Sequence, residues 1–232
     1  MTVPILLYHQ IAIPPAKPMP FRSMFVRPAS FRRQMALLKR LGYQGLSLRE
    51  AVPYIKGDKK GRVVAITFDD GFTNVLENAA PVLQQHGFTA TSFVVANQIG
   101  GINKWDEHLG IVTTSCMNAD QLQRWIGMGH EIGSHTLDHV QLTGVSDKEA
   151  LRQIAHSREV LKALLGIEVT SFAFPYGEVA AIHRAIAQEV GYSWAVTTER
   201  RSAGPADSAF ALPRLTIRRA DTIFHFLRKI LS

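Results

Sequence analysis

Cysteine, long apolar runs and an export signal are scarce or missing in this chain of 232 residues. The single cysteine, Cys116, cannot form an internal disulfide or complete a thiolate metal site. No apolar run approaches the roughly 18 residues that a membrane-spanning helix needs. Pro4 and the Tyr8-His9 pair interrupt the first apolar segment, which is not the pattern of a signal peptide. The sequence predicts a cytoplasmic protein without a transmembrane segment, or an extracellular or cell-envelope protein if a leader has been removed.

Basic residues are in excess, but no aromatic residues accompany them as a platform for stacking bases. The 26 Lys and Arg residues outnumber the 19 Asp and Glu residues, which gives a formal net charge of +7. This excess favours approach to anionic surfaces. The basic residues are scattered, however, over segments near residues 32–40, 56–62 and 218–229. We therefore expect a solvated basic surface and no nucleic-acid partner.

Segments typical of strands and of helices alternate along the chain. Apolar runs such as residues 63–68 predict buried strands, and segments with helical spacing of apolar residues lie between them. With 46% hydrophobic and 19% charged residues, this order predicts one α/β domain over residues 1–232. A closed or nearly closed β/α barrel is the favoured architecture, and a doubly wound open sheet is the alternative. In such a barrel the active site lies where the strands end.

Particular residues predict the bounds of two helices and one long loop. Ser30 predicts the start of a helix that ends at Gly42, and residues 74–86 predict one helix closed by Gly87. The proline-rich segment 12–30 is much longer than an ordinary connection. It predicts a functional or disordered loop between the first strand and the first helix.

Two adjacent carboxylates, Asp69 and Asp70, directly follow a buried strand, and Gly71 allows a sharp turn after them. Neighbouring carboxylates repel each other and lose hydration at a barrel mouth. A bound cation or a strong hydrogen-bond network must offset this cost. The simpler interpretation is an Asp-Asp-Gly turn that caps a helix.

Two histidines, His135 and His139, follow another short strand at a spacing of four residues. On a helical turn this spacing would bring both imidazoles to one face, as in zinc hydrolases. Taken alone, they could equally be loop histidines bonded to the backbone. Together with Asp70 they would form a set of two His and one carboxylate, which leaves a position open for water or substrate.

A third cluster ends the strand that reads SFAF and contains Pro175, Tyr176 and Gly177. A Pro-aromatic-Gly turn can fix the backbone and aim an N–H group at a developing oxyanion. Pro175 and the ring of Tyr176 could also form a wall for a sugar. Without the other clusters, this is only a turn signal.

The three motifs TFDDG, SHTLDH and FAFPYG, in this order, resemble those of the polysaccharide deacetylases, also called NodB-homology or carbohydrate esterase family 4 domains. The resemblance spans most of the chain. It implies a distorted (β/α)7 barrel, a divalent metal, and hydrolysis of N-acetyl groups from N-acetylglucosamine-containing polysaccharide. It further implies that Asp69 is the general base and that Asp70, His135 and His139 hold the metal. The backbone N–H of Tyr176 would contribute to the oxyanion hole.

Two family features are missing from their usual places. Most members have an arginine before the Pro-aromatic-Gly turn that orients the base, and this chain has Ala173 there. Members also end with an apolar strand of the type Leu-x-His that supplies the general acid. The late strand here reads LPRLTI and contains no histidine.

The first strand, ILLYH, ends in His9 and has the pattern of this missing last motif. Because the first and last strands of a closed barrel are neighbours, moving one strand from the end to the beginning preserves the site. We therefore expect His9 to be the general acid in a circularly permuted barrel. This order is similar to that of the poly-β-1,6-N-acetylglucosamine deacetylase branch. By the same logic Arg214, on the late strand, would pair with Asp69, and a structural or surface role is its alternative.

The expected enzyme is a metal-dependent polysaccharide N-deacetylase whose substrate is an N-acetylated amino-sugar polymer or oligomer. The ligand set favours Zn²⁺, and Co²⁺, Ni²⁺ or Fe²⁺ also suit it. Trp194 and Trp105 are further candidates for a sugar subsite, with a core position as the alternative for both. Two other functions stay open, namely a metal-dependent amidase on a small N-acyl or cyclic imide substrate and a non-catalytic glycan-binding relic.

Overall fold

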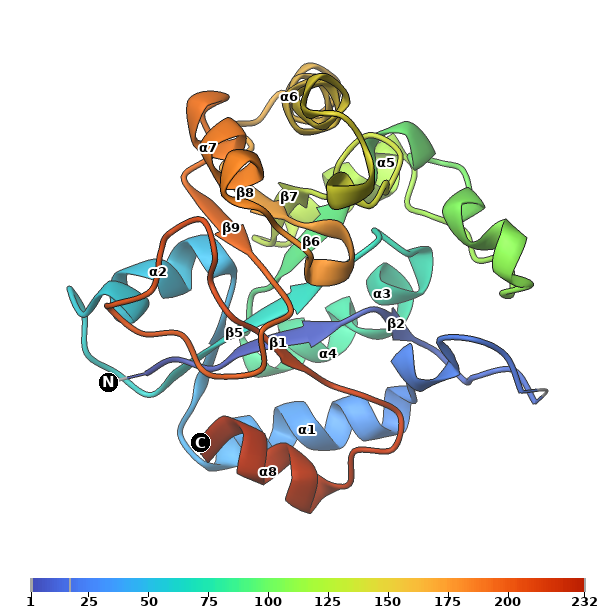
Figure 1. Cartoon of the computed structure of the whole chain (residues 1–232). Coiled ribbons are helices and arrows are strands. Elements are labelled where there is room, and N and C mark those ends of the chain that lie inside the picture. The colour runs from blue at the N-terminus through green and yellow to red at the C-terminus, as the bar shows by residue number, and fades with distance from the viewer. Residues whose placement is uncertain (1, 17, 232) are drawn as a thin grey trace.

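Parallel strands occupy the centre of the computed structural model, which describes residues 2–16 and 18–231. Within these residues the strands follow the order β10-β1-β5-β6-β7-β8-β9, and every neighbouring pair is parallel. Their bounds are β1 (Ile5–Tyr8), β5 (Val63–Phe68), β6 (Thr91–Val94), β7 (Glu131–Ser134), β8 (Ser171–Ala173), β9 (Trp194–Val196) and β10 (Leu215–Thr216). The helices lie outside this sheet (Figure 1).

The sheet curls until its two edges meet. Val196 of β9 forms a parallel bridge with Leu212, which lies just before β10. The Thr197 N–H donates to the Leu212 carbonyl at 2.9 Å, and the Leu212 N–H donates to the Ala195 carbonyl at 2.9 Å. β1 lies between β10 and β5, so the first strand of the chain is a neighbour of the last. The predicted α/β fold, a distorted (β/α)7 barrel with permuted strand order, is confirmed.

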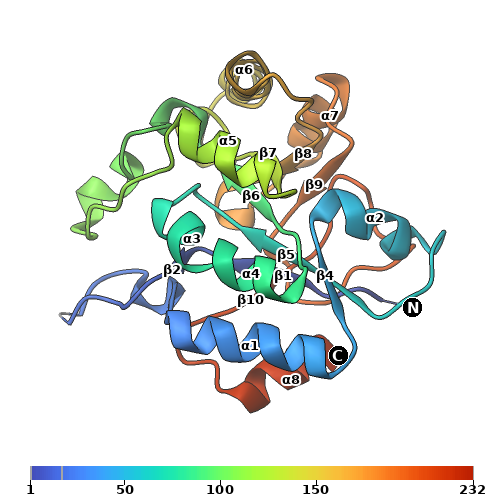
Figure 2. The same cartoon turned by 180° about the vertical axis from the view of Figure 1, so that it is seen from behind.

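Eight helices of the described residues cover the outside of the barrel. They are α1 (Pro28–Arg40), α2 (Leu48–Lys56), α3 (Thr73–Asn78), α4 (Ala80–His86), α5 (Ala119–Gly127), α6 (Asp147–Leu165), α7 (Ala181–Glu189) and α8 (Ile223–Leu231). α1 and α8 pack together on one side, and α6 and α7 on the opposite side (Figures 1 and 2). None of the described helices combines the length and the apolar character needed to cross a membrane.

Short strands and 3-10 helices complete the described elements. β4 (Gln44–Leu46) pairs with the first half of β5, and β2 (Gln10–Ile11) pairs with β3 (Phe25–Val26) at the base of the proline-rich loop. The 3-10 helices are η1 (Arg22–Met24), η2 (Ala96–Gln98), η3 (Lys104–Leu109), η4 (Leu142–Gly144) and η5 (Pro175–Gly177). The sequence did not predict β2, β3 or β4, because runs of two or three residues carry no clear periodicity.

Two helix boundaries differ from the prediction, and proline explains both. α1 begins at Pro28, with Arg27 in the cap position, so Ser30 lies inside the helix. The fixed φ angle of proline is already helical, and its missing N–H is not needed in the first turn. The helix predicted over residues 74–86 is divided at Ala79 into α3 and α4. Pro81 has no N–H to donate to residue 77, which interrupts the helical hydrogen bonding there.

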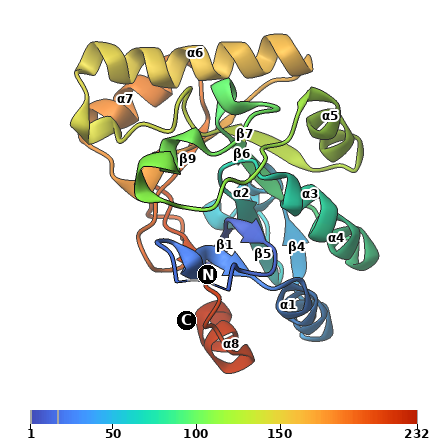
Figure 3. The same ribbon diagram turned by 90° about the vertical axis from the view of Figure 1, so that its right-hand side faces the viewer.

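The strands end on the side of the molecule that faces the viewer in Figure 3. The loop that follows β1 and the long segment between β6 and α5, which contains η3, project from this same side (Figures 1 and 3). Side chains from the strand ends and from both loops can therefore meet above the barrel.

Candidate metal centre and active site

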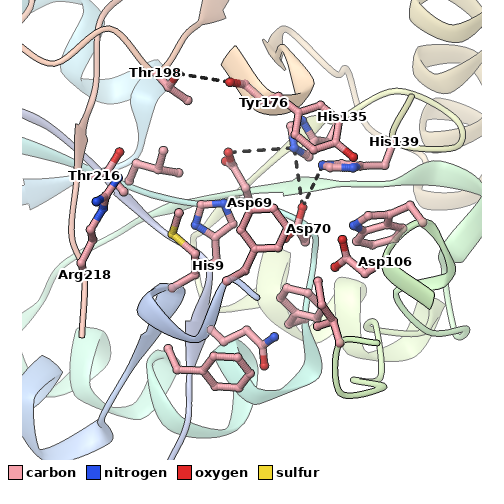
Figure 4. Close-up of a pocket in the computed structure, with 18 of the residues that line it drawn as sticks. His9, Asp69, Asp70, Asp106, His135, His139, Tyr176, Thr198, Thr216 and Arg218 are labelled. Atoms are coloured by element: carbon pink, nitrogen blue, oxygen red, sulfur yellow. Dashed lines mark hydrogen bonds and ion pairs between the residues drawn. The ribbon is translucent and has the colours of Figure 1, made fainter. Parts of the chain in front are cut away.

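A pocket of about 290 Å³ opens at the carboxyl ends of the strands, between the two projecting loops (Figure 4). It brings together side chains from β1, β5 and β7 that are far apart in the sequence. The predicted site residues that line it are His9, Asp69, Asp70, His135, His139 and Tyr176.

Asp70, His135 and His139 form a buried cluster on one side of this pocket. The Oδ1 atom of Asp70 lies 3.6 Å from Nε2 of His135 and 3.4 Å from Nε2 of His139. One ligand atom from each residue lies within 4.8 Å of the other two. Asp70 has a φ of 75° immediately after β5, and this left-handed conformation turns the chain at the strand end. The three residues have the composition and spacing of a divalent metal site.

The protonation of the cluster fits a cation. Nδ1 of His135 lies 2.7 Å from the Ala173 carbonyl, which fixes the proton there and leaves Nε2 as a lone-pair donor. Burial lowers the pKa of His135, and burial together with His135 lowers the pKa of His139, so both imidazoles are neutral. Burial and the charge of Asp69 raise the pKa of Asp70. Oδ1 of Asp70 has no hydrogen-bond partner among the described residues. A divalent cation would satisfy this oxygen and remove the cost of burying the carboxylate.

The segment from His135 to His139 is a loop, which was one of the two conformations considered from the spacing, and not a helical turn. Thr136 and His139 have φ angles of 67° and 59°, in the left-handed region. The His139 N–H donates to Oγ1 of Thr136 at 3.0 Å, and Gln153 of α6 accepts from the N–H groups of Leu137 at 3.1 Å and Asp138 at 3.0 Å. This long-range anchor brings the two imidazoles together in place of helical geometry.

Two aromatic rings contact the imidazole of His139. The ring of Trp105 lies 4.8 Å from it, and the ring of Tyr176 lies 4.9 Å from it, measured between centroids. Nδ1 of His139 has no hydrogen-bond partner in the described part of the chain. Ring packing therefore orients this histidine, whereas a carbonyl orients His135.

Asp69 lies beside the cluster and forms a two-pronged ion pair with Arg214. Both carboxylate oxygens accept from the guanidinium, at 2.7 Å each. Arg214 is completely buried, and its Nε donates to the Thr197 carbonyl at 2.9 Å. Burial alone would raise the pKa of Asp69, but the charges of Arg214 and His135 outweigh it and hold this pKa at about 2. Arg214, which directly precedes β10, thus provides the cation that is missing at the position of Ala173.

This ion pair predicts how activity depends on pH. With a pKa of about 2, Asp69 is deprotonated throughout the range between about pH 4 and 8. In Arg214→Gln the paired charge is lost while burial remains, so the pKa of Asp69 rises. The acid limb of kcat/KM is then expected to move to higher pH, while Arg214→Lys, which keeps the charge, should move it less. Coincident acid limbs for wild type and Arg214→Gln would show that this pair does not control the protonation of the base.

His9 follows β1 and, in the view of Figure 4, lies between Asp69 and Arg218 in the lining of the pocket. Its Nδ1 atom is buried and has no hydrogen-bond partner among the described residues. Burial, together with the charges of Arg214 and His135, lowers the pKa of His9 to about 4 although Asp69 raises it. The imidazole is therefore neutral near pH 7 in the resting site, and its Nδ1 atom is buried without a partner among the described residues.

Comparison with known proteins assigns the chain to a family. A family model described as polysaccharide deacetylase matches residues 56–195. YxkH of Bacillus subtilis, which bears a polysaccharide deacetylase name, is 30% identical over 217 residues, covering 93% of this chain and 71% of that protein. The chain belongs to the polysaccharide deacetylase family. The resemblance predicted from the three motifs is confirmed.

Two further matches are a named relative and a solved structure of similar fold. The poly-β-1,6-N-acetyl-D-glucosamine N-deacetylase of Staphylococcus epidermidis is 26% identical over 202 residues, covering 83% of this chain and 68% of that protein. The solved structure of the Streptococcus pyogenes deacetylase PplD in complex with acetate is similar with a TM-score of 0.84. That match covers 99% of this chain and 98% of PplD at 23% identity, and it concerns the fold.

In this member of the family the Pro-aromatic-Gly turn is strongly constrained. Tyr176 has a φ of 61° and is half-exposed at the pocket, and its carbonyl accepts from Oγ1 of Thr198 at 3.3 Å. A Cβ atom at Gly177 would collide with Thr198, so only glycine fits there. Pro175 is buried and does not line the pocket. This corrects its predicted contact with substrate, because the residue fixes the turn from behind.

Trp194 is also placed away from the pocket, which corrects its predicted sugar-binding role. It is the first residue of β9, at the end of the barrel opposite the active site. The ammonium group of Lys56, at the end of α2, lies 4.5 Å from the centroid of its ring. The partly buried indole packs against the hydrophobic cluster that contains Val52 of α2 and Val63 of β5.

Several residues of the pocket wall were not predicted. They come from the two projecting loops and from the turns after β9 and β10. These residues are Phe21, Met24, Asp106, Ile111, Thr198, Arg200, Thr216 and Arg218. Trp105, which was a candidate for a sugar subsite, also lines this pocket. The sequence signal for them is weak, since loop residues follow neither helical nor strand periodicity.

Proposed function

We propose that this family member is a metal-dependent N-deacetylase that hydrolyses N-acetyl groups of N-acetylglucosamine-containing polysaccharide. The observation that carries the proposal is the Asp69–Arg214 pair, which lies directly beside the Asp70, His135 and His139 cluster. A deprotonated carboxylate, a cation site and an unpaired imidazole thus line one pocket. The name of the Staphylococcus epidermidis relative supports the amino-sugar substrate.

Asp70, His135 and His139 would hold the metal, and we propose Zn²⁺ because two imidazoles and one carboxylate suit it. The same set also accepts Co²⁺, Ni²⁺ or Fe²⁺. When bound, the ion would supply Lewis-acid chemistry at the acetyl carbonyl and at the attacking water.

Asp69 is proposed to accept a proton from the attacking water. Its carboxylate is ionised because Arg214 holds its pKa at about 2, and the two-pronged ion pair fixes its orientation. The backbone N–H of Tyr176 is proposed to donate to the oxyanion that forms from the acetyl group. The turn at Gly177, which accepts no larger residue, would keep that N–H in place.

His9 is proposed to protonate the amine nitrogen as it leaves. A histidine whose pKa is lowered to about 4 is a strong proton donor once it carries a proton. Negative charge that develops on the acetyl oxygen favours the protonated imidazole, so His9 would take up a proton from solvent and pass it to the amine nitrogen as the C–N bond breaks. The products are acetate and a free amino sugar.

Release of acetate from N-acetylglucosamine oligomers tests this proposal. Metal-loaded protein is expected to release acetate from a panel of β-1,6-linked and β-1,4-linked oligomers, and the preferred linkage identifies the polymer class. Asp69→Asn is the matched control, since it keeps the shape of the site and removes the base. No release from any oligomer, with metal bound, would contradict the proposal and favour a small N-acyl substrate or a binding role.

A further inference from the structure

Two arginines line the active-site pocket without a protein partner. Among the described residues, neither the Arg200 nor the Arg218 guanidinium has a hydrogen bond or an ion pair. Arg218 is half-buried and Arg200 is exposed. Arg214 is the third arginine near the reaction centre, and its guanidinium donates to both oxygens of Asp69 and to the Thr197 carbonyl.

The carboxylates near these two arginines in the chain are bound to other cations. Arg201 donates to Glu199 at 2.8 Å and to Asp207 at 2.6 Å. Lys229 forms an ion pair with Asp221, whose Oδ2 also accepts from the backbone N–H of Arg218 at 2.8 Å. The acidic groups of the nearby turns are therefore engaged, and Arg200 and Arg218 line the pocket without a carboxylate partner among the described residues.

The charges of the pocket are separated in space. Arg218 and Thr216 lie on one side of His9, whereas Asp70, His139 and Asp106 lie on the other (Figure 4). The charges of Asp69 and Arg214 cancel each other, and a divalent cation would exceed the single charge of Asp70. Asp106, the other carboxylate of the lining, lies on the far side of His9 from Arg218 (Figure 4). A neutral sugar polymer would satisfy none of the positive charge on the Arg218 side.

Resting on the proposed deacetylase function, we propose that the natural glycan carries an anionic group close to the acetylated amino sugar and that Arg218, assisted by Arg200, binds it. A carboxylate or a phosphate on the neighbouring sugar supplies the required chemistry. The planar guanidinium donates two parallel hydrogen bonds to either group. Arg218 contributes more than Arg200, because a half-buried charge is screened less by water than an exposed one.

The test compares three N-acetylglucosamine oligomers of equal length, in which the neighbouring sugar is neutral, carries a carboxylate or carries a phosphate. Acetate release by the metal-loaded wild type should have a kcat/KM about 10-fold higher for an anionic oligomer than for the neutral one. In Arg218→Gln this ratio should fall toward one, and in Arg200→Gln it should fall less. Arg219→Gln is the matched control, because Arg219 is exposed, adjacent in sequence and outside the pocket lining.

The outcomes separate this proposal from the proposed function. Equal kcat/KM values for all three oligomers, or an anionic preference that Arg218→Gln leaves intact, would overturn the anionic substrate while leaving the deacetylase function standing. A preference for only one charged oligomer supports the proposal and identifies carboxylate or phosphate as the source. Absence of acetate release from all three, with metal bound, would overturn both. Added salt should weaken the preference of the wild type and leave the neutral oligomer less affected.

Discussion

Asp70→Asn is expected to lose its bound metal and, with it, deacetylase activity. The change removes the one carboxylate of the cluster and leaves two neutral imidazoles, His135 and His139, to hold a divalent cation. Altering residues that merely orient metal ligands costs about 10- to 100-fold in affinity, so loss of a ligand should cost at least about 100-fold. Elemental analysis after dialysis measures the occupancy. Asp106→Asn is the matched control, since Asp106 lines the same pocket outside the cluster.

The stability of the metal-free protein separates this effect from misfolding. Burial and the charge of Asp69 already make an ionised Asp70 unfavourable in the metal-free fold. Asp70→Asn should therefore leave the free energy of unfolding of metal-free protein unchanged or raise it. Full metal occupancy in Asp70→Asn would show that Asp70 is not a ligand, and a metal-free variant that unfolds more easily would point to a structural role.

His9→Ala is expected to lower kcat for N-acetylglucosamine oligomers by about 10²- to 10⁴-fold, the usual contribution of a general acid. Metal occupancy should remain normal, because His9 lies outside the Asp70, His135 and His139 cluster. A sugar amine must be protonated as it leaves, whereas the phenolate of 4-nitrophenyl acetate leaves without a proton. Hydrolysis of that ester should consequently survive in His9→Ala.

Equal losses on the oligomer and on the ester would assign His9 to substrate binding or to packing. Unchanged activity on the oligomer would remove it from the mechanism altogether. His108→Ala controls for the removal of an imidazole, since His108 is exposed on the neighbouring loop and does not line the pocket.

Much of the reaction centre was predictable because its residues stand where strands end. His9 follows β1, Asp69 and Asp70 follow β5, and His135 follows β7. Apolar runs reveal such strands, and parallel strands in a barrel place their carboxyl ends together. Arg214 was predicted differently, from the arginine missing at Ala173 and the permuted strand order, and it pairs with a residue 145 positions away.

Other features depend on tertiary contacts that periodicity does not encode. The turn from His135 to His139 is anchored by Gln153 of α6, and its left-handed residues, Thr136 and His139, carry no glycine signal. Trp105 belongs to a loop whose path is set by contacts such as the Thr114 N–H donating to Oδ1 of Asn103 at 2.7 Å. Such long-range contacts decide which loop residues face the pocket.

Trp194 shows a different limit of the sequence. The YSWAVTT run identifies β9, but the run does not mark where the regular strand begins. Trp194 is its first residue, so its ring lies at the amino end of the barrel, beside Lys56. An aromatic residue on a correctly predicted strand is thus far from the site if it stands at the amino end of that strand.

Acetate release before and after metal restoration is the most direct test of the central claim. Protein stripped with a chelator should release no acetate from an N-acetylglucosamine oligomer, and one equivalent of Zn²⁺ should restore release in the wild type but not in Asp70→Asn. Undiminished release by fully stripped wild-type protein would contradict the account, as would restored metal binding without any release of acetate.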